Sequence, residues 1–240
     1  MSFLDRDGVR ISYEIAGSGP ALLLTHGFTG SSALYAKNVA ALARANTVIT
    51  WDIRGHGESD CPADPAAYSV PLSVADMAAL LDRAGAGRAV IAGHSLGGFL
   101  SLEFHLAHPA RVAGLILIDT GPGYRSDAPR AGWNERAERF ARDFEAKGGE
   151  RALGLARAAR GILAQHDGRV LESLPAIEVP TLIVVGESDT PFLAGSRYMS
   201  EKIPGAKLEV IANAGHSPNA DQPEEFARVV TGFLRSVPRS

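Results

Sequence analysis

One short run of the chain contains a serine in a setting that is typical of a nucleophile. The run Gly93-His94-Ser95-Leu96-Gly97-Gly98 has the pattern Gly-x-Ser-x-Gly, between an apolar stretch at residues 89–92 and a helical pattern at residues 96–108. A strand that turns sharply into a helix strains the backbone at the apex and leaves no room for side chains two positions away. The apex hydroxyl then lies beside the free N–H groups of the helix. The spacing therefore predicts Ser95 as a nucleophile.

A serine nucleophile needs a base and an acid, and two later residues have suitable positions. Asp189 follows a continuous apolar run at residues 181–185, and His216 lies in a Gly-His-Ser-Pro loop after the strand pattern at residues 207–211. Proteins with α/β sheets place their sites at such strand ends. The imidazole would take the serine proton, and the carboxylate would hold its Nδ1–H. We therefore predict His216 as the base and Asp189 as the acid.

Asp119 is a second candidate for the acid. It ends the apolar pattern at residues 112–119, so its carboxylate could also approach His216. It leads directly into Gly121, and we expect its carboxylate to bind backbone N–H groups at the start of the segment that follows. The sequence leaves both aspartates open, with Asp189 preferred.

The elements that would position these residues are visible in the hydrophobic pattern. Continuous apolar runs without alternation predict strands that are buried on both faces, and they lie at residues 21–25, 48–51, 89–92, 114–118 and 181–185. Residues 9–15 alternate instead, which predicts a half-buried antiparallel strand near a sheet edge. Helical patterns lie between the runs, among them residues 72–81 with Ser73 as the expected N-cap. The pattern indicates an α/β fold with a mostly parallel central sheet flanked by helices.

One stretch interrupts this alternation. Residues 121–176 contain no strand pattern and begin at Gly121-Pro122-Gly123. We interpret them as a small helical cap, inserted in mid-chain into a core of residues 1–120 and 177–240. Trp133 and Phe140, at helical spacing within the cap, are expected to line a substrate pocket together with Phe28. The alternative, that these rings only bury the cap on the sheet, stays open.

Four blocks of the chain together resemble the α/β-hydrolase fold family. They are His26-Gly27-Phe28-Thr29-Gly30, the Asp-Ile-Arg-Gly-His-Gly-Glu-Ser run at residues 52–59, the serine run at 93–98, and Gly186-Glu187-Ser188-Asp189 with Gly215-His216. The resemblance covers residues 9–119 and 177–236, and the order Ser, Asp, His is the order of the family's triad. It implies that the N–H groups of Leu96 and Phe28 bind the oxyanion. It also implies that residues 52–59 form a structural loop near the site.

The resemblance implies a hydrolase that acts on a small-molecule ester. Ser95 would attack the carbonyl of a small to medium, fairly apolar carboxylic ester and form an acyl-enzyme. Lactone hydrolysis, carbon–carbon bond hydrolysis and perhydrolysis use the same triad, and they stay open as alternatives. A non-catalytic ligand sensor on the same scaffold is an alternative of another class. Physiological substrate, acyl length, stereopreference and oligomeric state are not determined by the sequence.

Composition excludes several other classes. The 240 residues carry a net charge of −3, so there is no basic footprint for nucleic acid. No His-Glu-x-x-His, paired Cys-x-x-Cys, calcium-loop or dinucleotide motif occurs, so we expect no metal and no cofactor. One cysteine, Cys61, cannot form an internal disulfide. No apolar run approaches the ~20 residues of a membrane span, and charges in residues 1–7 argue against a signal peptide. We expect a cytoplasmic protein.

Overall fold

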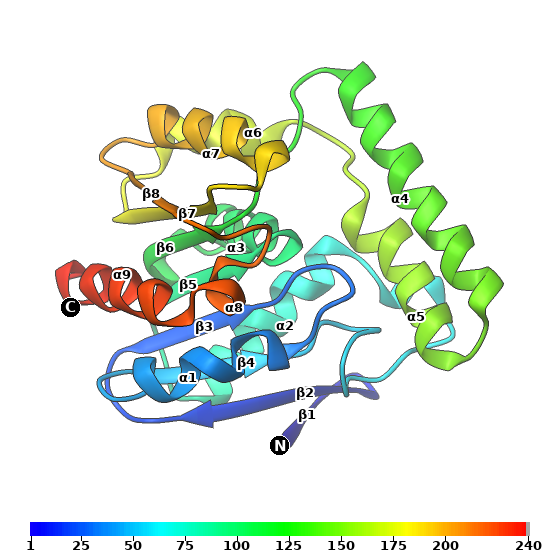
Figure 1. The fold of residues 1–240 in the computed structure, drawn as a ribbon. Coiled ribbons are helices and arrows are strands. Elements are labelled where there is room, and N and C mark those ends of the chain that lie inside the picture. Colours follow the sequence, from blue (N-terminus) through cyan, green and yellow to red (C-terminus); the bar gives the residue numbers. More distant parts are fainter. Residues whose placement is uncertain (239–240) are drawn as a thin grey trace.

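The computed structural model describes residues 1–238, in which eight strands form one mixed sheet in the order β1-β2-β4-β3-β5-β6-β7-β8 (Figure 1). The strands are β1 (Ser2–Arg6), β2 (Val9–Ala16), β3 (Ala21–Thr25), β4 (Thr47–Trp51), β5 (Ala89–His94), β6 (Val112–Ile118), β7 (Thr181–Gly186) and β8 (Lys207–Ile211). Strands β3 to β8 run parallel, whereas β2 is antiparallel to both of its neighbours. The predicted α/β class and the antiparallel strand at residues 9–15 are both confirmed.

Helices cover both faces of the sheet. One face carries α1 (Ala36–Leu42), α8 (Pro218–Asp221) and α9 (Pro223–Ser236), and the other carries α2 (Val70–Arg83), α3 (Leu96–Ala107), α6 (Arg169–Ser173) and α7 (Thr190–Lys202). Strand β3 shows why its run is continuously apolar. Leu23 packs in the core that contains Met77 of α2, whereas Leu22 and Leu24 pack in the core that contains Phe226 of α9. Both faces of the central strands are therefore buried, as the absence of alternation predicts.

Between β6 and β7 the chain forms two helices that stand apart from the sheet. Helices α4 (Asp127–Lys147) and α5 (Glu150–Ala158) lie side by side at one end of the molecule, on the right in Figure 1, and a π-helical turn (Ala159–Leu163) follows them. A hydrogen bond connects α4 to this turn: Nε1 of Trp133 donates to Leu163 O at 2.9 Å. Helix α6 also belongs to residues 121–176, but it packs against α3.

The first strand, β1, has no counterpart among the predicted elements. It is largely exposed and includes two charged residues, Asp5 and Arg6, so it lacks an apolar pattern. Its register comes from pairing with β2, where Phe3 lies opposite Ser12. An exposed edge strand needs only one hydrogen-bonding neighbour, which local hydrophobicity does not reveal.

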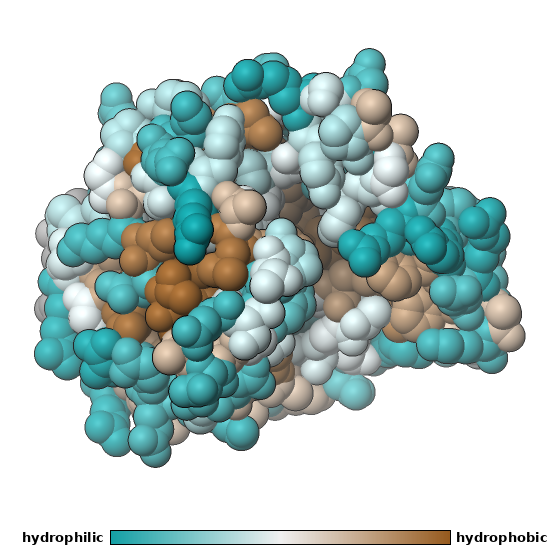
Figure 2. All heavy atoms as spheres, turned by 45° about the horizontal axis from the view of Figure 1, so that its top comes forward, coloured by the Kyte–Doolittle hydropathy of each residue, from teal (hydrophilic) through white to brown (hydrophobic). Residues whose placement is uncertain are grey.

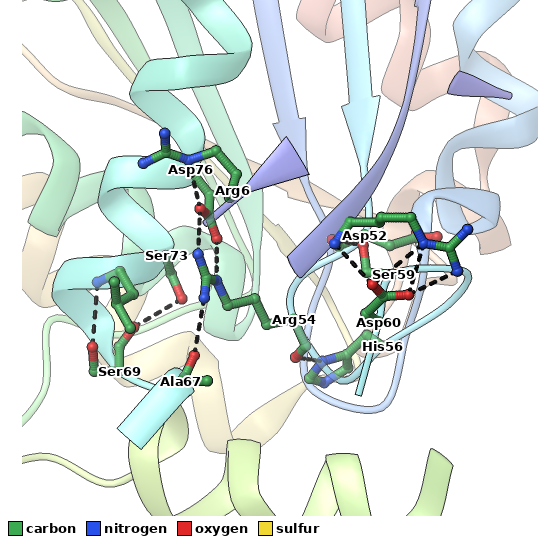
Figure 3. Close-up of polar contacts among 12 residues, drawn as sticks. Arg6, Asp52, Arg54, His56, Ser59, Asp60, Ala67, Ser69, Ser73 and Asp76 are labelled. Atoms are coloured by element: carbon green, nitrogen blue, oxygen red, sulfur yellow. Dashed lines mark hydrogen bonds and ion pairs between the residues drawn. The ribbon is translucent and has the colours of Figure 1, made fainter. Parts of the chain in front are cut away.

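Helix α2 begins earlier than the pattern predicts, and its N-cap is Ser69, so the prediction of Ser73 was wrong. The Ser69 Oγ accepts a hydrogen bond from Leu72 N at 3.3 Å. Ser73 lies within the first turn, and its hydroxyl donates to Ser69 O at 3.0 Å (Figure 3). Pro71, at the second helical position, is compatible with this earlier start, because proline has no backbone N–H that would remain unpaired in the first turn.

The loop after β4 holds several elements together through buried polar groups. The Asp52 carboxylate accepts hydrogen bonds from Ser32 N at 2.6 Å and from Glu58 N at 2.8 Å. Arg54 pairs with the fully buried Asp76 of α2 at 2.6 Å, and Asp76 also pairs with Arg6 at 3.2 Å (Figure 3). These contacts are structural, as expected for residues 52–59.

Among residues 1–238, no helix is both long and apolar enough to cross a membrane.

Candidate active site

Ser95 lies at the apex of a sharp turn between β5 and α3. Its backbone has φ 51° and ψ −115°, a strained conformation for a residue with a side chain. Two hydrogen bonds hold this conformation: Ser95 N donates to Ile118 O at 2.8 Å, and Thr120 Oγ1 donates to Ser95 O at 2.7 Å. A Cβ placed on Gly93 would lie 2.0 Å from the carbonyl oxygen of Gly97. The turn therefore needs glycine where the Gly-x-Ser-x-Gly pattern has it.

Asp189 and His216 come from two neighbouring loops and meet through a hydrogen bond. Asp189 follows β7 and begins α7, and His216 lies in the loop after β8. The Nδ1 of His216 lies 2.7 Å from Oδ2 of Asp189. The carboxylate is 6% exposed, whereas the imidazole is 43% exposed. A buried carboxylate thus orients a ring whose other nitrogen is free for proton transfer.

The His216 loop is held in place from two sides. Nε2 of His94, the residue before Ser95, donates to the carbonyl oxygen of His216. The Gly215 N–H donates to Oδ2 of Asp221 in α8 at 2.9 Å. These contacts join the loop to the turn that carries Ser95 and to α8.

A pocket opens directly at Ser95. Its apolar wall includes Leu96, Phe99, Trp133, Leu163 and Phe192, and its polar groups include Thr120, Tyr124 and Gln165. It encloses about 790 Å³, including the space that is open to solvent at its mouth. Figure 2 shows the surface hollowed beside the helical segment on the right, with hydrophobic side chains in the hollow. Ser95 therefore borders an apolar recess.

The predicted pocket residues fall into two groups. Leu96 and Trp133 line the pocket, whereas Phe28 and Phe140 are not among its lining residues. Phe28 packs against Phe140, with ring centroids 5.8 Å apart, and also against Phe144 and His56. These rings join the β3 loop to α4, so they anchor the helical segment beside the pocket.

The turn after β3 lies directly against the serine. A Cβ placed on Gly27 would lie 3.1 Å from the Cβ of Ser95 and 2.7 Å from Nδ1 of His94. Phe28 lies in this turn, and Leu96 follows Ser95 as the first residue of α3. The backbone N–H groups of both residues thus lie on the segments that flank Ser95, which suits an oxyanion site.

Asp119 lies in this site, but not in the contact expected for it. Its Oδ1 accepts a hydrogen bond from Gly186 N at 3.0 Å, at the end of β7, and binds no N–H of the following segment. The expectation was wrong because β6 and β7 are adjacent in the sheet, so the end of one strand faces the end of the other. The Asp119 side chain is fully buried, and its φ of 42° is in the left-handed region.

Asp119, Asp189 and His216 each bring an atom capable of binding a metal to within 4.8 Å of the others. Hydrogen bonds already engage this group, since His216 is bonded to Asp189 and Asp119 to Gly186. Two carboxyl groups and an imidazole therefore lie close together at this edge of the sheet. That arrangement suits proton transfer at the imidazole.

Phe192 borders the site and was missed by the sequence analysis. Its ring centroid lies 4.9 Å from that of His216, and its side chain lines the pocket. The available signal was its position three residues after Asp189 in the helix that begins there, because residues at this spacing share a helix face.

Buried histidines near the site should make the fold sensitive to acid. Burial lowers the pKa of His56 to about 3 and that of His94 to about 4, whereas an unfolded imidazole titrates near about 6.5. Below about pH 6.5 the unfolded chain therefore takes up protons that the folded chain refuses. The stability that these two histidines contribute is therefore expected to be complete above that pH and to be lost progressively as the pH falls toward 4.

Urea midpoints measured between pH 7.5 and 4.5 would check this expectation. His56→Asn should reduce the pH dependence, whereas His166→Gln, at an exposed histidine, should leave it unchanged. A pH dependence in His56→Asn equal to that of the wild type would contradict the proposed cause.

Comparisons with known proteins agree with this architecture. Residues 22–229 match the model of the alpha/beta hydrolase family. The 3-oxoadipate enol-lactonase 1 of Acinetobacter baylyi is 28% identical, over 97% of this chain and 96% of the relative. The putative carbamate hydrolase RutD of Pseudomonas savastanoi pv. phaseolicola is 30% identical, over 90% and 94%. The structure of an esterase from Thermogutta terrifontis matches with a TM-score of 0.86 and 28% identity, over 98% and 97%.

Proposed function

The chain belongs to the alpha/beta hydrolase family, and on that premise we propose that it is a serine hydrolase that cleaves carboxylic esters through an acyl-enzyme. The observation that carries the proposal is the 2.7 Å bond between His216 and a buried Asp189, beside a pocket that opens at Ser95. The apolar wall of the pocket favours small to medium, fairly apolar substrates.

The proposed reaction uses these groups in sequence. Oγ of Ser95 attacks the ester carbonyl while Nε2 of His216 accepts its proton, and Asp189 stabilises the imidazolium. The carbonyl oxygen becomes an oxyanion that accepts hydrogen bonds from the N–H groups of Phe28 and Leu96. The imidazolium then protonates the leaving alcohol, and a water molecule activated by His216 releases the acid. In this proposal α4 and α5 act as a cap that shapes the acyl site.

Lactone hydrolysis is the second candidate, favoured by the enol-lactonase among the relatives. A lactone is a cyclic ester, so the same attack opens the ring and leaves the alcohol on the acyl group. The elements of the site are the same, and only the shape of the pocket would decide between open and cyclic substrates.

A panel of substrates tests the proposal. Nitrophenyl esters of two to ten acyl carbons, aliphatic lactones and dienoic diketo acids would be compared by kcat/KM. We expect the esters to be hydrolysed with the highest kcat/KM. Turnover of lactones alone would support the second candidate, and the absence of turnover on every substrate would favour the ligand sensor.

Trp133 should influence which acyl groups are accepted. Its indole forms part of the pocket wall, and replacing it by alanine would enlarge the pocket at that wall. We expect Trp133→Ala to raise the ratio of long-chain to short-chain activity by about tenfold, since one methylene group in an apolar pocket contributes about 1–3 kcal/mol.

Phe140→Ala is the matched control, because Phe140 lies in the same helix but outside the pocket lining. Its ratio of long-chain to short-chain activity should equal that of the wild type. A similar shift in both variants would mean that the packing of α4 on Phe28, and not the pocket wall, sets the preference.

A further inference from the structure

The carboxyl group of Asp119 is buried in the site with only part of its hydrogen-bonding capacity used. It is fully buried, and only one of its oxygens has a donor, since Oδ1 accepts from Gly186 N. Its other oxygen, Oδ2, is buried and has no hydrogen-bond donor among the described residues. A buried carboxylate oxygen without a donor is costly.

The neighbour of this carboxyl group is another carboxyl group. A carboxyl oxygen of Asp119 lies within 4.8 Å of one from Asp189 and of a ring nitrogen of His216. Two carboxylates this close and this buried cannot both be ionised without a large penalty, so such a pair shares one proton. Asp189 is the member that accepts from His216 Nδ1, and its ionised form is the one that stabilises the imidazolium.

We propose that Asp119 is a protonated positioning residue, whose carboxylic acid donates a hydrogen bond from Oδ2 to the Asp189 carboxylate. This role rests on the proposed function of Asp189 as the acid. The proton gives the orphaned Oδ2 a partner, while Oδ1 keeps its bond to Gly186. Asp189 is then held between two donors, His216 on one side and Asp119 on the other, and its orientation toward the imidazole is fixed.

The surrounding charges favour the protonated form. Burial raises the pKa of Asp119 to about 8, and the nearby Asp189 and Asp221 act in the same direction, while the Gly186 N–H acts against them. Asp189 begins α7, Asp221 belongs to α8, and His216 lies in the loop after β8. The two charged groups that act on Asp119 from these elements are therefore acidic.

The protonated acid should leave a signature in alkaline solution. As the pH rises through about 8, Asp119 loses its proton, stops donating to Asp189 and repels it. We expect kcat/KM of the wild type to decline over that range. Asparagine reproduces the protonated acid, because its oxygen can accept from Gly186 and its NH₂ can donate to Asp189.

The kinetics of three Asp119 variants with a nitrophenyl ester as substrate test the effect of this residue on catalysis. Asp119→Leu, which removes both hydrogen bonds, should lower kcat about 10- to 100-fold. Asp119→Asn should restore most of that loss and should lack the decline above pH 8. Asp119→Glu should retain the decline, since it keeps a titrating acid. A loss in Asp119→Asn equal to that in Asp119→Leu, or an unchanged alkaline decline in Asp119→Asn, would overturn the proposal.

A second measurement does not depend on turnover or on the leucine variant folding. The resting enzyme, labelled with ¹³C at aspartate carboxyl carbons, would be titrated by NMR, and the signal missing from Asp119→Asn identifies Asp119. A midpoint near 8 supports the proposal, and a midpoint near 4 overturns it. If the esters are not hydrolysed but the midpoint is near 8, the proposed function fails while the protonated acid stands.

Thermal unfolding tests the protonation of Asp119 through the pH dependence of Tm. The pKa of Asp119 is higher in the folded state than in the unfolded state, where it is about 3.9, so ionisation of the unfolded chain destabilises the fold as the pH rises from 4 to 8. Asp119→Asn removes this effect, and its Tm should exceed that of the wild type by a margin that grows with pH. A margin that is absent or constant would contradict a protonated Asp119.

Discussion

Replacing Ser95 by alanine is expected to lower kcat by about a million-fold, the magnitude seen when a serine-hydrolase nucleophile is removed. The reason is that the acyl-enzyme forms on the hydroxyl of Ser95, which lines the pocket at the sharp turn between β5 and α3. Initial rates on the best ester of the panel would measure the loss. Reaction with a fluorophosphonate probe, followed by intact mass, should label the wild type once and the variant not at all.

Ser126→Ala is the control for this experiment. Ser126 is exposed, and its side chain makes no capping bond at the start of α4. It should keep both turnover and labelling. Wild-type turnover in Ser95→Ala, or a label on another serine, would refute the assignment of the nucleophile.

Replacing Asp189 by asparagine should have the second largest effect, a loss of kcat of up to about ten-thousandfold. The fold should survive, because the side chains have the same shape. The loss arises because the amide can donate its NH₂ to Nδ1 of His216, which favours the wrong tautomer and leaves the imidazolium without a counter-charge. Steady-state kinetics near pH 7, with circular dichroism as a check on folding, would measure it.

Asp119→Asn is the matched comparison for the acid, since both aspartates end neighbouring strands of the sheet. We expect a much larger loss of kcat for Asp189→Asn than for Asp119→Asn. Equal losses would indicate that the two carboxyl groups share the role of the acid. A larger loss for Asp119→Asn would transfer the role of the acid to the end of β6.

Much of the fold was predictable because its signals are local. Continuous apolar runs predicted the central strands, since a strand buried on both faces needs no polar side chain. The glycine before Ser95 predicted the sharp turn, because the clash that Gly93 relieves is with the carbonyl group of Gly97, within five residues of chain. Gly97, in contrast, makes room for the carbonyl oxygen of Thr25 in β3. The order of Ser95, Asp189 and His216 suggested a triad through the family resemblance.

Contacts between distant residues could not be predicted in this way. The edge strand β1 depends on its pairing with β2. Helical spacing treats Trp133 and Phe140 alike, yet only Trp133 faces the pocket. The direction in which α4 packs decides this difference.

The position of Asp119 beside Asp189 is the clearest example of a contact that the sequence does not predict. The sequence alone indicated that Asp119 and Asp189 each end a strand. Only the adjacency of β6 and β7 directed the Asp119 carboxyl to Gly186 and brought it beside Asp189. A carboxyl group 67 positions away from its hydrogen-bond donor leaves no local pattern in the chain. Its protonation depends on burial and on neighbouring charges, which exist only once the sheet has formed.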